Sequence, residues 1–535
     1  MSDFFDRHVC LELLTKRMSG FKEGYRQNIA IIGDEFIGKT TLVCAFLNKY
    51  YDPRIITIYL ENRPETLESF ARRFIGVLFY SFLRNSDMEL KEHVEFLLDK
   101  SSRYVPATTE KARMILVALR KRKKHAIFTD LLKLCDSIHH ETGKLCAVVF
   151  DEFHNLESLS TATVFAEWSK LLVVQKSTMY IITSSRRAKA KTILSKHLSL
   201  LFGNFEIVGL EPFDAKTSEQ YLTQRLEGIA LDANWRNFLI HFTGGHPFYL
   251  KTLADILQKA GDPDLVDMLE NLLFEPSGLL HQRFSNYLKK FIDIPSSQEY
   301  LAILYHIASG HNTLKSIAHA LGKAQKELSK KVLYLLESDC ISRTGDFLTV
   351  NDRVFNFWLQ FVYKEKLQSL TFDAKNQKEF FRKHLGTMIS EFSLSSQKPM
   401  IERMIELLRA FENEVIPLER KKIRLDHFQE IKPVSLNNKN LKNGLIGRSL
   451  ESVWIVAIKP EPITEDDIVE FSKECRKFRN KLQRKVIITL QDTDANARLK
   501  AMEEKVWTWD IANLNRLLDF YSQPRIIANN TAVLP

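Results

Sequence analysis

A short stretch near the N-terminus has the residue types and spacing of a phosphate-binding loop. Residues 33–40 read Gly-Asp-Glu-Phe-Ile-Gly-Lys-Thr and fit the pattern G-x-x-x-x-G-K-[ST], known as Walker A. In this pattern backbone N–H groups cradle phosphates, the lysine reaches the β- and γ-phosphates, and the final hydroxyl binds Mg²⁺. We therefore expect a nucleoside triphosphate to bind here, with Thr40 as a metal ligand, through Gly33, Gly38, Lys39, Thr40 and Thr41.

The segments on either side of this loop have the pattern that such a loop requires. The apolar run 29–32 precedes it and predicts a buried strand, and 41–47 predicts a helix. A strand, a glycine loop and a helix start place backbone N–H groups and a helix dipole around an anion. The alternative is a glycine-rich turn before an ordinary helix.

Two carboxylates further along could supply the chemistry that the loop lacks. The apolar run 145–150 ends in Asp151 and Glu152, at the carboxyl end of a predicted strand, where sites in α/β proteins lie. We expect Asp151 to hold Mg²⁺ and Glu152 to act as the base for the attacking water. This is a Walker B arrangement, and the alternative is a charged turn that ends a strand.

Hydroxyl residues follow the predicted strand 179–183. Thr183, Ser184 and Ser185 lead into Arg186. A hydroxyl here could sense the γ-phosphate or orient water, and Arg186 could stabilise developing charge as a catalytic residue. A serine-rich turn is also common after a strand, so both interpretations remain open.

The elements that must position these residues predict an α/β P-loop NTPase followed by three further segments. Residues 1–212 alternate helices with apolar strands, which predicts a parallel sheet with helices on both faces. The predicted strands are 29–32, 55–60, 145–150, 179–183 and 205–210. Residues 213–290 predict a helical lid, and 291–368 a winged helix with helices 314–321 and 324–336 and a hairpin 340–350. Residues 369–535 predict a connector and a mixed α/β domain.

Composition is that of an ordinary globular protein. The 535 residues are 45% hydrophobic and 27% charged, and the six cysteines are scattered without a C-x-x-C pair. No apolar run is long enough to span a bilayer, and the first residues do not read as a secretory signal. We therefore expect a cytoplasmic protein with no membrane partner. The net charge of +10 permits contact with nucleic acid without establishing it.

The motifs in this order resemble the archaeal-type ATPases of the STAND branch of AAA+-related P-loop proteins. Residues 4–7, Phe-Phe-Asp-Arg, are similar to the F-x-x-R-like segment that opens that family. Residues 244–247, Gly-Gly-His-Pro, resemble its lid turn, and 352–358 its D-x-x-x-x-F-W-like segment. The resemblance implies an ATP- and Mg²⁺-dependent hydrolase that acts as a switch through a protein partner or self-association. It also places Arg7, His246 and Pro247 beside the nucleotide, although 243–247 could equally be an ordinary interhelical turn.

Two departures from the family favour a slow or non-hydrolysing, nucleotide-bound scaffold as an alternative. Asp34 and Glu35 lie inside the loop, and their carboxylates weaken triphosphate binding unless they turn outward. The arginine that the family carries after a leucine-tyrosine-glycine stretch is Asn204 here, after 201–203. A third possibility is ATP-dependent processing of DNA or RNA. It is suggested by the basic net charge and by two predicted folds associated with DNA, the winged helix and the nuclease-like domain described next. The second helix of the winged helix carries Lys323, Lys326, Lys330 and Lys331, which could approach phosphates, although winged helices in such proteins often bind no DNA. The basic run 120–124 is more often a solvated helix face than a nucleic-acid site.

The C-terminal segment resembles, in the order of its elements, the PD-(D/E)XK nuclease-like domain that often ends such ATPases. These nucleases need an acidic residue on one strand and E-x-K on the next, so that carboxylates hold Mg²⁺ and the lysine orients water. The second element here reads Ala457-Ile458-Lys459, and the strand 428–436 offers only Glu430. We expect a nuclease-like fold without nuclease activity, kept for binding or assembly.

Overall fold

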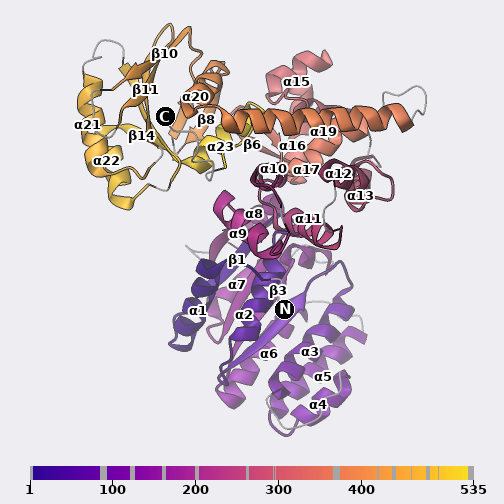
Figure 1. The fold of residues 1–535 in the computed structure, drawn as a ribbon. Coiled ribbons are helices and arrows are strands. Elements are labelled where there is room, and N and C mark those ends of the chain that lie inside the picture. The colour runs from indigo at the N-terminus through magenta and orange to yellow at the C-terminus, as the bar shows by residue number, and fades with distance from the viewer. Residues whose placement is uncertain are drawn as a thin grey trace. The chain divides into compact units, whose positions relative to one another are not determined.

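A five-stranded parallel sheet forms the core of residues 1–212 (Figure 1). Its strands are β1 (Asn28–Gly33), β2 (Ile55–Glu61), β3 (Leu145–Asp151), β4 (Thr178–Ser184) and β5 (Phe205–Leu210). They pair in the order β2-β3-β4-β1-β5, so β4 lies between the strands that carry the two predicted phosphate-site motifs. Every residue of β1 and β4 is buried. The predicted parallel sheet of a P-loop NTPase is thereby confirmed.

The chain is described in this computed structural model with several gaps, and it divides into two compact units, 1–212 and 213–535. The described residues are 4–84, 93–120, 127–159, 164–198, 204–229, 231–260, 264–292, 295, 297–364, 374–418, 421–436, 441–459, 461–476, 482–491 and 493–527.

Alternate residues of each central strand pack into separate cores on the two faces of this sheet. Ile29 and Ile31 of β1 join α1 (His8–Lys22) and α2 (Lys39–Lys49) on one face. Ala30 and Ile32 join the core of the opposite face, which contains α3 (Leu67–Leu83), α6 (Ile127–Thr142), α7 (Val164–Val174) and α8 (Arg187–Lys196). The helices α4 (Val94–Ser101) and α5 (Pro106–Arg120) extend this second core, and a short 3-10 helix, η1 (Phe153–Leu159), follows β3. Apolar burial on both faces explains why the strands read as continuous hydrophobic runs.

The second unit begins with helices and a hairpin. The first group is α9 (Ala215–Arg225), α10 (Ala233–Thr243), α11 (Pro247–Ala260), α12 (Leu265–Leu273) and α13 (Leu279–Ile292). We call the next group the 297–363 segment: α14 (Ser297–Ala308), α15 (Leu314–Leu321), α16 (Gln325–Glu337), β6 (Ile341–Thr344), β7 (Phe347–Val350), α17 (Arg353–Trp358) and η2 (Leu359–Tyr363). A capping box of Thr313 and Ser316 begins α15, and Gly322 in the left-handed region ends it. Two helices and a hairpin therefore lie where the sequence predicts them.

A mixed sheet forms the centre of the C-terminal part. The long helix α19 (Ala374–Gln397) and α20 (Met400–Arg409) lead to a small hairpin, β8 (Val415–Leu418) and β9 (Lys421–Arg424). The sheet has the order β10 (Glu430–Ser435), β11 (Asn443–Arg448), β12 (Val453–Lys459), β13 (Leu482–Thr489), β14 (Val506–Trp509). The β10-β11 and β11-β12 pairs are antiparallel and the β12-β13 and β13-β14 pairs parallel. The remaining helices are α21 (Glu465–Cys475), α22 (Ala495–Glu504) and α23 (Ile511–Phe520).

A half-buried charge cluster joins three parts of the second unit. Asp519 on α23 forms ion pairs with Arg353, at the start of α17, and with Arg525, at 2.6 Å. The backbone N–H of Arg525 donates to Nδ1 of His241 on α10, at 3.3 Å. Burial alone would raise the pKa of Asp519, but the two guanidinium groups outweigh it and lower the pKa to about 2. The carboxylate therefore stays charged and holds the three parts together.

We expect Asp519→Asn to destabilise the second unit by about 1 to 3 kcal/mol at pH 7, because it leaves two half-buried guanidinium groups without a counter-charge. The pKa of Asp519 is lower in the folded state than its ordinary value of 3.8. Its contribution is thus fully present above about pH 4 and is lost as the pH falls toward 2. Urea denaturation at pH 7 and pH 3 checks this, and the gap between wild type and variant should narrow at pH 3. Glu503→Gln, in an exposed pair with Lys500, is the control; an Asp519→Asn effect no larger than this control's would contradict the prediction.

Among the described residues, no helix combines the length and apolar character that crossing a bilayer requires.

Candidate nucleotide site

The predicted phosphate-binding loop connects β1 to α2 with the tight backbone that its glycines allow. β1 ends at Gly33, where an added Cβ would lie 2.5 Å from the carbonyl oxygen of Leu210, so only glycine fits. Gly38 precedes α2 with φ of 100°, a left-handed conformation that glycine adopts without strain. Phe36 also has positive φ, at 59°, and its side chain is 58% exposed. Glycine is therefore required at the end of β1 and favoured at the start of α2, on either side of the loop.

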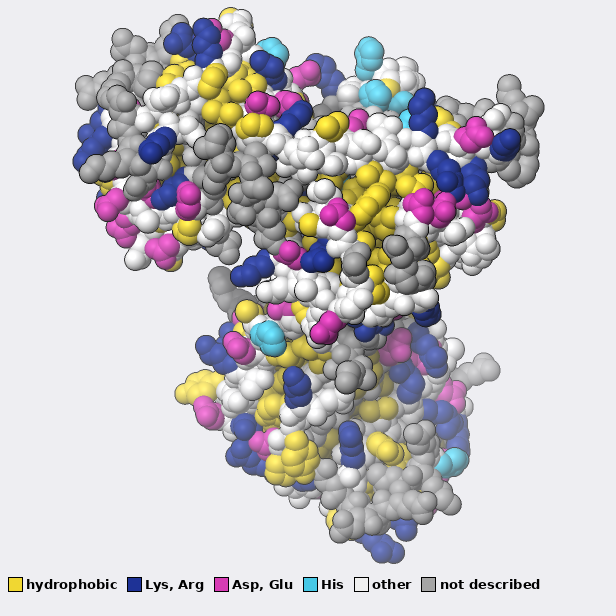
Figure 2. All heavy atoms as spheres, in the orientation of Figure 1, with side chains coloured by type: hydrophobic (Ala, Val, Ile, Leu, Met, Phe, Trp, Pro, Cys, Tyr) yellow, Lys and Arg dark blue, Asp and Glu magenta, His cyan; other side chains and the backbone are white. Residues whose placement is uncertain are grey.

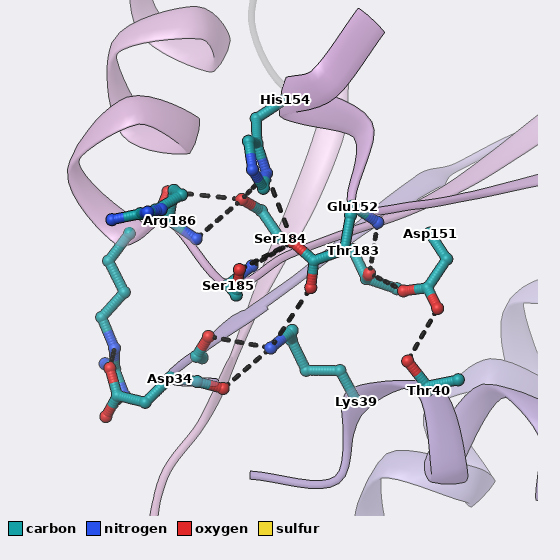
Figure 3. Close-up of polar contacts among 12 residues, drawn as sticks. Asp34, Lys39, Thr40, Asp151, Glu152, His154, Thr183, Ser184, Ser185 and Arg186 are labelled. Carbon is teal, nitrogen blue, oxygen red and sulfur yellow. Dashed lines mark hydrogen bonds and ion pairs between the residues drawn. The ribbon is translucent and has the colours of Figure 1, made fainter. Parts of the chain in front are cut away.

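Lys39 lies inside this loop with its ammonium group directed at loop carbonyls and at Glu152 (Figure 3). Its Nζ donates to the carbonyl oxygens of Gly33 at 3.1 Å and Asp34 at 2.8 Å, and lies 3.7 Å from Oε1 of Glu152. Burial lowers the pKa of Lys39 from its ordinary value, and the charges of Glu152 and Asp151 oppose that shift. The result is a buried cation at the predicted position of the phosphates.

Asp151 is the centre of a hydroxyl cluster at the carboxyl end of β3. Its Oδ2 accepts hydrogen bonds from Thr40 and from the hydroxyl of Tyr59, each at 2.7 Å. Its Oδ1 accepts a hydrogen bond from Thr183 on β4. Burial, and then the hydrogen bond to Asp151, raise the pKa of Tyr59, so this phenol stays a donor. Thr40 and Asp151, the two predicted metal ligands, are therefore in direct contact.

These residues fit a magnesium–nucleotide complex. Mg²⁺ prefers oxygen ligands and is commonly held by one or two protein oxygens together with substrate phosphates. The Thr40 hydroxyl and the Asp151 carboxylate provide that number and type, beside a buried lysine. When bound, the ion would neutralise charge on the phosphates.

Glu152 is held by the turn that follows β4. It has φ of 52°, and its Oε2 accepts hydrogen bonds from the backbone N–H of Ser185 at 2.9 Å and from its hydroxyl at 2.8 Å. Nδ1 of His154 lies 3.3 Å from the same oxygen and 2.9 Å from Oγ of Ser184. Burial, followed by the charges of Lys189 and Arg186, lowers the pKa of His154 to about 4, so its ring is neutral at pH 7. The carboxylate of Glu152 is thus oriented toward Lys39 by neutral groups.

Two arginines, Arg186 and Arg187, follow β4. The backbone N–H of Arg186 donates to Oγ of Ser184 at 3.1 Å, and that hydroxyl donates to the Arg186 carbonyl at 3.3 Å. Arg187 reaches the phosphate loop: its Nε donates to Oδ1 of Asp34 at 2.7 Å. The sequence pattern indicated Arg186 as the functional arginine and gave no role to Arg187. The available signal was the carboxylate of Asp34, which inside a phosphate loop requires a counter-charge.

The other predicted nucleotide ligands are Thr41, Arg7, His246 and Pro247. Thr41 is exposed on α2. Arg7, with φ of 66°, donates to the backbone oxygen of Glu211 at 2.6 Å. His246 and Pro247 belong to the second unit. They follow Gly245, which packs so closely against the backbone of Phe213 that an added Cβ would lie 2.0 Å from the Phe213 carbonyl oxygen. A role for these last two residues in nucleotide binding stays a prediction.

The 297–363 segment turns its hairpin inward within the second unit. A Cβ on Gly345, between β6 and β7, would lie 1.8 Å from the backbone oxygen of Val415 on β8, and Phe347 stacks on Phe520 at 4.6 Å. Lys323 and Lys331 both pair with Glu299, at 3.2 and 2.8 Å. The hairpin and half of the predicted basic helix surface therefore have partners inside the chain.

On the face drawn in Figure 2, Lys and Arg side chains of the described residues are interspersed with Asp and Glu. Of the basic run 120–124, residues 121–124 lie outside the described residues, as does the 201–203 stretch.

Glu430 and Lys459 occupy opposite ends of the C-terminal sheet. Glu430 is in register with Arg448 and then Val453, whereas the other end of β10, Ser435, aligns with Asn443 and Ile458. Five residues of strand separate these ends by about 17 Å. Between β10 and β12 lies β11, which the sequence did not predict and which carries no carboxylate. Lys459 pairs with Asp467 at 2.6 Å, within the capping box of α21.

Three similar solved structures have low identity to this chain. The Walker-type ATPase of Pyrococcus abyssi is 18% identical with a TM-score of 0.49, covering 67% of this chain and 96% of that one. The ORC2 protein of Aeropyrum pernix is 11% identical with a TM-score of 0.40, covering 72% and 94%. A STAND protein with a tetratricopeptide repeat sensor from Pyrococcus horikoshii is 13% identical with a TM-score of 0.29, covering 76% and 50%. Similarity at this level identifies neither an activity nor a partner. No protein-family model matches the sequence, and no curated protein matches it.

Proposed function

We propose that this protein binds ATP with Mg²⁺ at residues 33–40 and hydrolyses it as a STAND-like molecular switch. The observation that carries the proposal is the convergence of Lys39, Thr40, Asp151 and Glu152 at the carboxyl ends of β1 and β3. A binding loop alone would not need an oriented second carboxylate. Glu152 lies next to the lysine that would hold the phosphates, so a water between them could lose its proton to this carboxylate.

The chain's own residues have separate roles in this proposal. Lys39 binds the β- and γ-phosphates, Thr40 and Asp151 hold the ion, and Thr183 keeps Asp151 in place. Ser185 and His154 fix the carboxylate of Glu152. Arg186 remains part of the proposal as a charge-stabilising group because it follows β4. Arg7, His246 and Pro247 remain part of it as nucleotide contacts on the strength of the family resemblance.

A slow or non-hydrolysing scaffold is the second candidate, and the contacts of Glu152 favour it. The same oxygen of this carboxylate accepts two hydrogen bonds from Ser185, and a base so engaged has to release a partner or use its other oxygen. ATP binding and turnover must therefore be measured separately.

The experiment is a titration of the full chain with a fluorescent ATP analogue, followed by phosphate release with Mg²⁺ and with EDTA. We expect saturable binding that unlabelled ATP displaces, and release that EDTA abolishes. If GTP displaces the fluorescent analogue and ATP does not, the proposed binding of ATP is contradicted. If ATP binds but no Mg²⁺-dependent phosphate release is seen, either alone or with DNA added, the result would support the non-hydrolysing scaffold. No binding at millimolar ATP would contradict both candidates.

We further propose that the C-terminal domain is a nuclease-like fold that no longer cuts nucleic acid and serves binding or assembly with a protein partner or a second copy of the chain. Purified protein with Mg²⁺ or Mn²⁺ is expected to leave plasmid DNA and single-stranded RNA intact, because no carboxylate on β11 accompanies Lys459. Gel analysis of these substrates checks this. Metal-dependent cleavage that Lys459→Ala removes would contradict the prediction, whereas cleavage unchanged in that variant would indicate a contaminating nuclease.

A further inference from the structure

One guanidinium group holds two carboxylates beside the phosphate-binding loop. Arg187 contacts Asp34 through Nε at 2.7 Å and through Nη2 at 3.1 Å. It contacts Glu211 through Nη1 at 2.7 Å and through Nη2 at 3.0 Å. Both contacts are two-pronged, the geometry in which arginine binds a carboxylate most strongly. Arg187 is therefore a bridge between residue 34 of the loop and residue 211.

The bridge starts at a residue whose backbone also holds Lys39. The carbonyl oxygen of Asp34 accepts a hydrogen bond from Nζ of Lys39 at 2.8 Å, while its carboxylate faces Arg187. The negative charge of Asp34 is thus carried by a residue of the phosphate-binding loop itself. Without a counter-ion it would oppose a triphosphate, and Arg187 supplies that counter-ion.

The other end of the bridge lies at the end of the first unit. Glu211 is followed by Pro212, the last residue of that unit, and Arg7 donates to the Glu211 backbone oxygen at 2.6 Å. The two carboxylates carry two negative charges, whereas the guanidinium group of Arg187 carries one positive charge. A phosphate group and Asp34 would therefore compete for the same guanidinium.

We propose that Arg187 is a charge-compensating residue that sets nucleotide affinity, and that Asp34 and Glu211 restrain it. The inference rests on the proposed ATP site and deepens it. It makes Arg187 a positioning residue for the loop and Asp34 an inhibitory one. The two partners of one ion pair should consequently affect ATP binding in opposite directions.

The test is a double-mutant cycle in the full chain with Asp34→Asn, Arg187→Gln and the double variant. ATP dissociation constants are measured by displacement of a fluorescent analogue in the presence of Mg²⁺. We expect Asp34→Asn to bind ATP about three- to tenfold more tightly and Arg187→Gln about tenfold more weakly. The double variant should lie near wild type. Glu211→Gln should also bind more tightly, by a smaller factor, because this carboxylate is 63% exposed and screened by water.

Arg17→Gln is the matched control. Arg17 pairs with Glu206 at 2.6 Å on the same unit, with side chains 34% and 30% exposed, against 31% and 32% for Arg187 and Asp34. It should leave the ATP dissociation constant unchanged. If Arg187→Gln fails to fold, Arg187→Lys replaces it in the test. This variant keeps the positive charge but loses the two-pronged contacts with the carboxylates, so it should weaken ATP binding by a smaller factor than expected for Arg187→Gln.

A purely structural role predicts another result. If the pair only stiffens the loop, Asp34→Asn and Arg187→Gln both weaken ATP binding, and that outcome overturns the inference while leaving the proposed function intact. If wild type and every variant bind no ATP, the proposed function fails and the inference with it.

Discussion

Lys39→Ala is expected to weaken ATP binding by about 30- to 1000-fold, which corresponds to about 2 to 4 kcal/mol. The reason is that Lys39 is a buried cation, 4% exposed, and no other lysine occupies the loop. Truncation removes the charge that faces the phosphates and leaves the carboxylates of Asp151 and Glu152 without it. Displacement of a fluorescent ATP analogue measures the effect.

Lys49→Ala, at the far end of the same helix, is the control for this experiment. It removes an equal charge from α2 without touching the loop, so the ATP dissociation constant should not change. If both variants bind ATP as wild type does, the nucleotide site does not lie at residues 33–40.

Glu152→Gln is expected to lower the rate of ATP hydrolysis by about 10²- to 10⁴-fold while ATP still binds. The amide can keep the hydrogen bonds from Ser185 but cannot accept a proton from water at neutral pH. Phosphate release at saturating ATP measures the rate, and titration measures the affinity. The separation of the two effects distinguishes a base from a residue that merely shapes the loop.

Glu157→Gln is the matched control here. Glu157 lies five residues further along, 61% exposed, in a pair with Lys189. It should not change turnover. Equal turnover in wild type and Glu152→Gln would remove Glu152 as the base and would leave the scaffold as the better account of the chain.

The sequence was most informative where local chemistry and the fold impose the same requirement. Gly33 must be glycine because the backbone of Leu210 lies close to it, and Gly38 has a positive φ that favours glycine. The sequence pattern therefore identifies the loop. The inner strands β1, β3 and β4 are buried on both faces, and continuous apolar runs marked them. Asp151 and Glu152 follow such a run, and the register of β3 against β4 explains why Thr183 meets Asp151.

The sequence was least informative where partners are distant along the chain. Arg187 is separated from Asp34 by 153 positions, and no periodic pattern links a loop residue to the start of a helix so far away. The neighbouring Arg186 has the same chemistry, so residue type alone did not single out Arg187 as the partner of Asp34. Tyr59 was missed in the same way, because its ring lies within an ordinary apolar strand.

The C-terminal sheet was only partly predicted. β11 carries Gly444 and Gly447, which weaken the apolar alternation that identifies a strand. Missing this strand made β10 look like the neighbour of β12, and Glu430 was therefore considered as a partner for Lys459. Strand pairing is a tertiary property, and the observed order moves Glu430 to the opposite end of the sheet.

The central claim is that the loop binds ATP and that Glu152 is the base that hydrolyses it. The most direct measurement is the identity of the nucleotide bound to protein incubated with radiolabelled ATP and Mg²⁺, then separated from free nucleotide. We predict bound ADP in wild type, bound ATP in Glu152→Gln, and no bound nucleotide in Lys39→Ala. Bound ADP in Glu152→Gln at the wild-type level, or no bound nucleotide in wild type, would contradict the account.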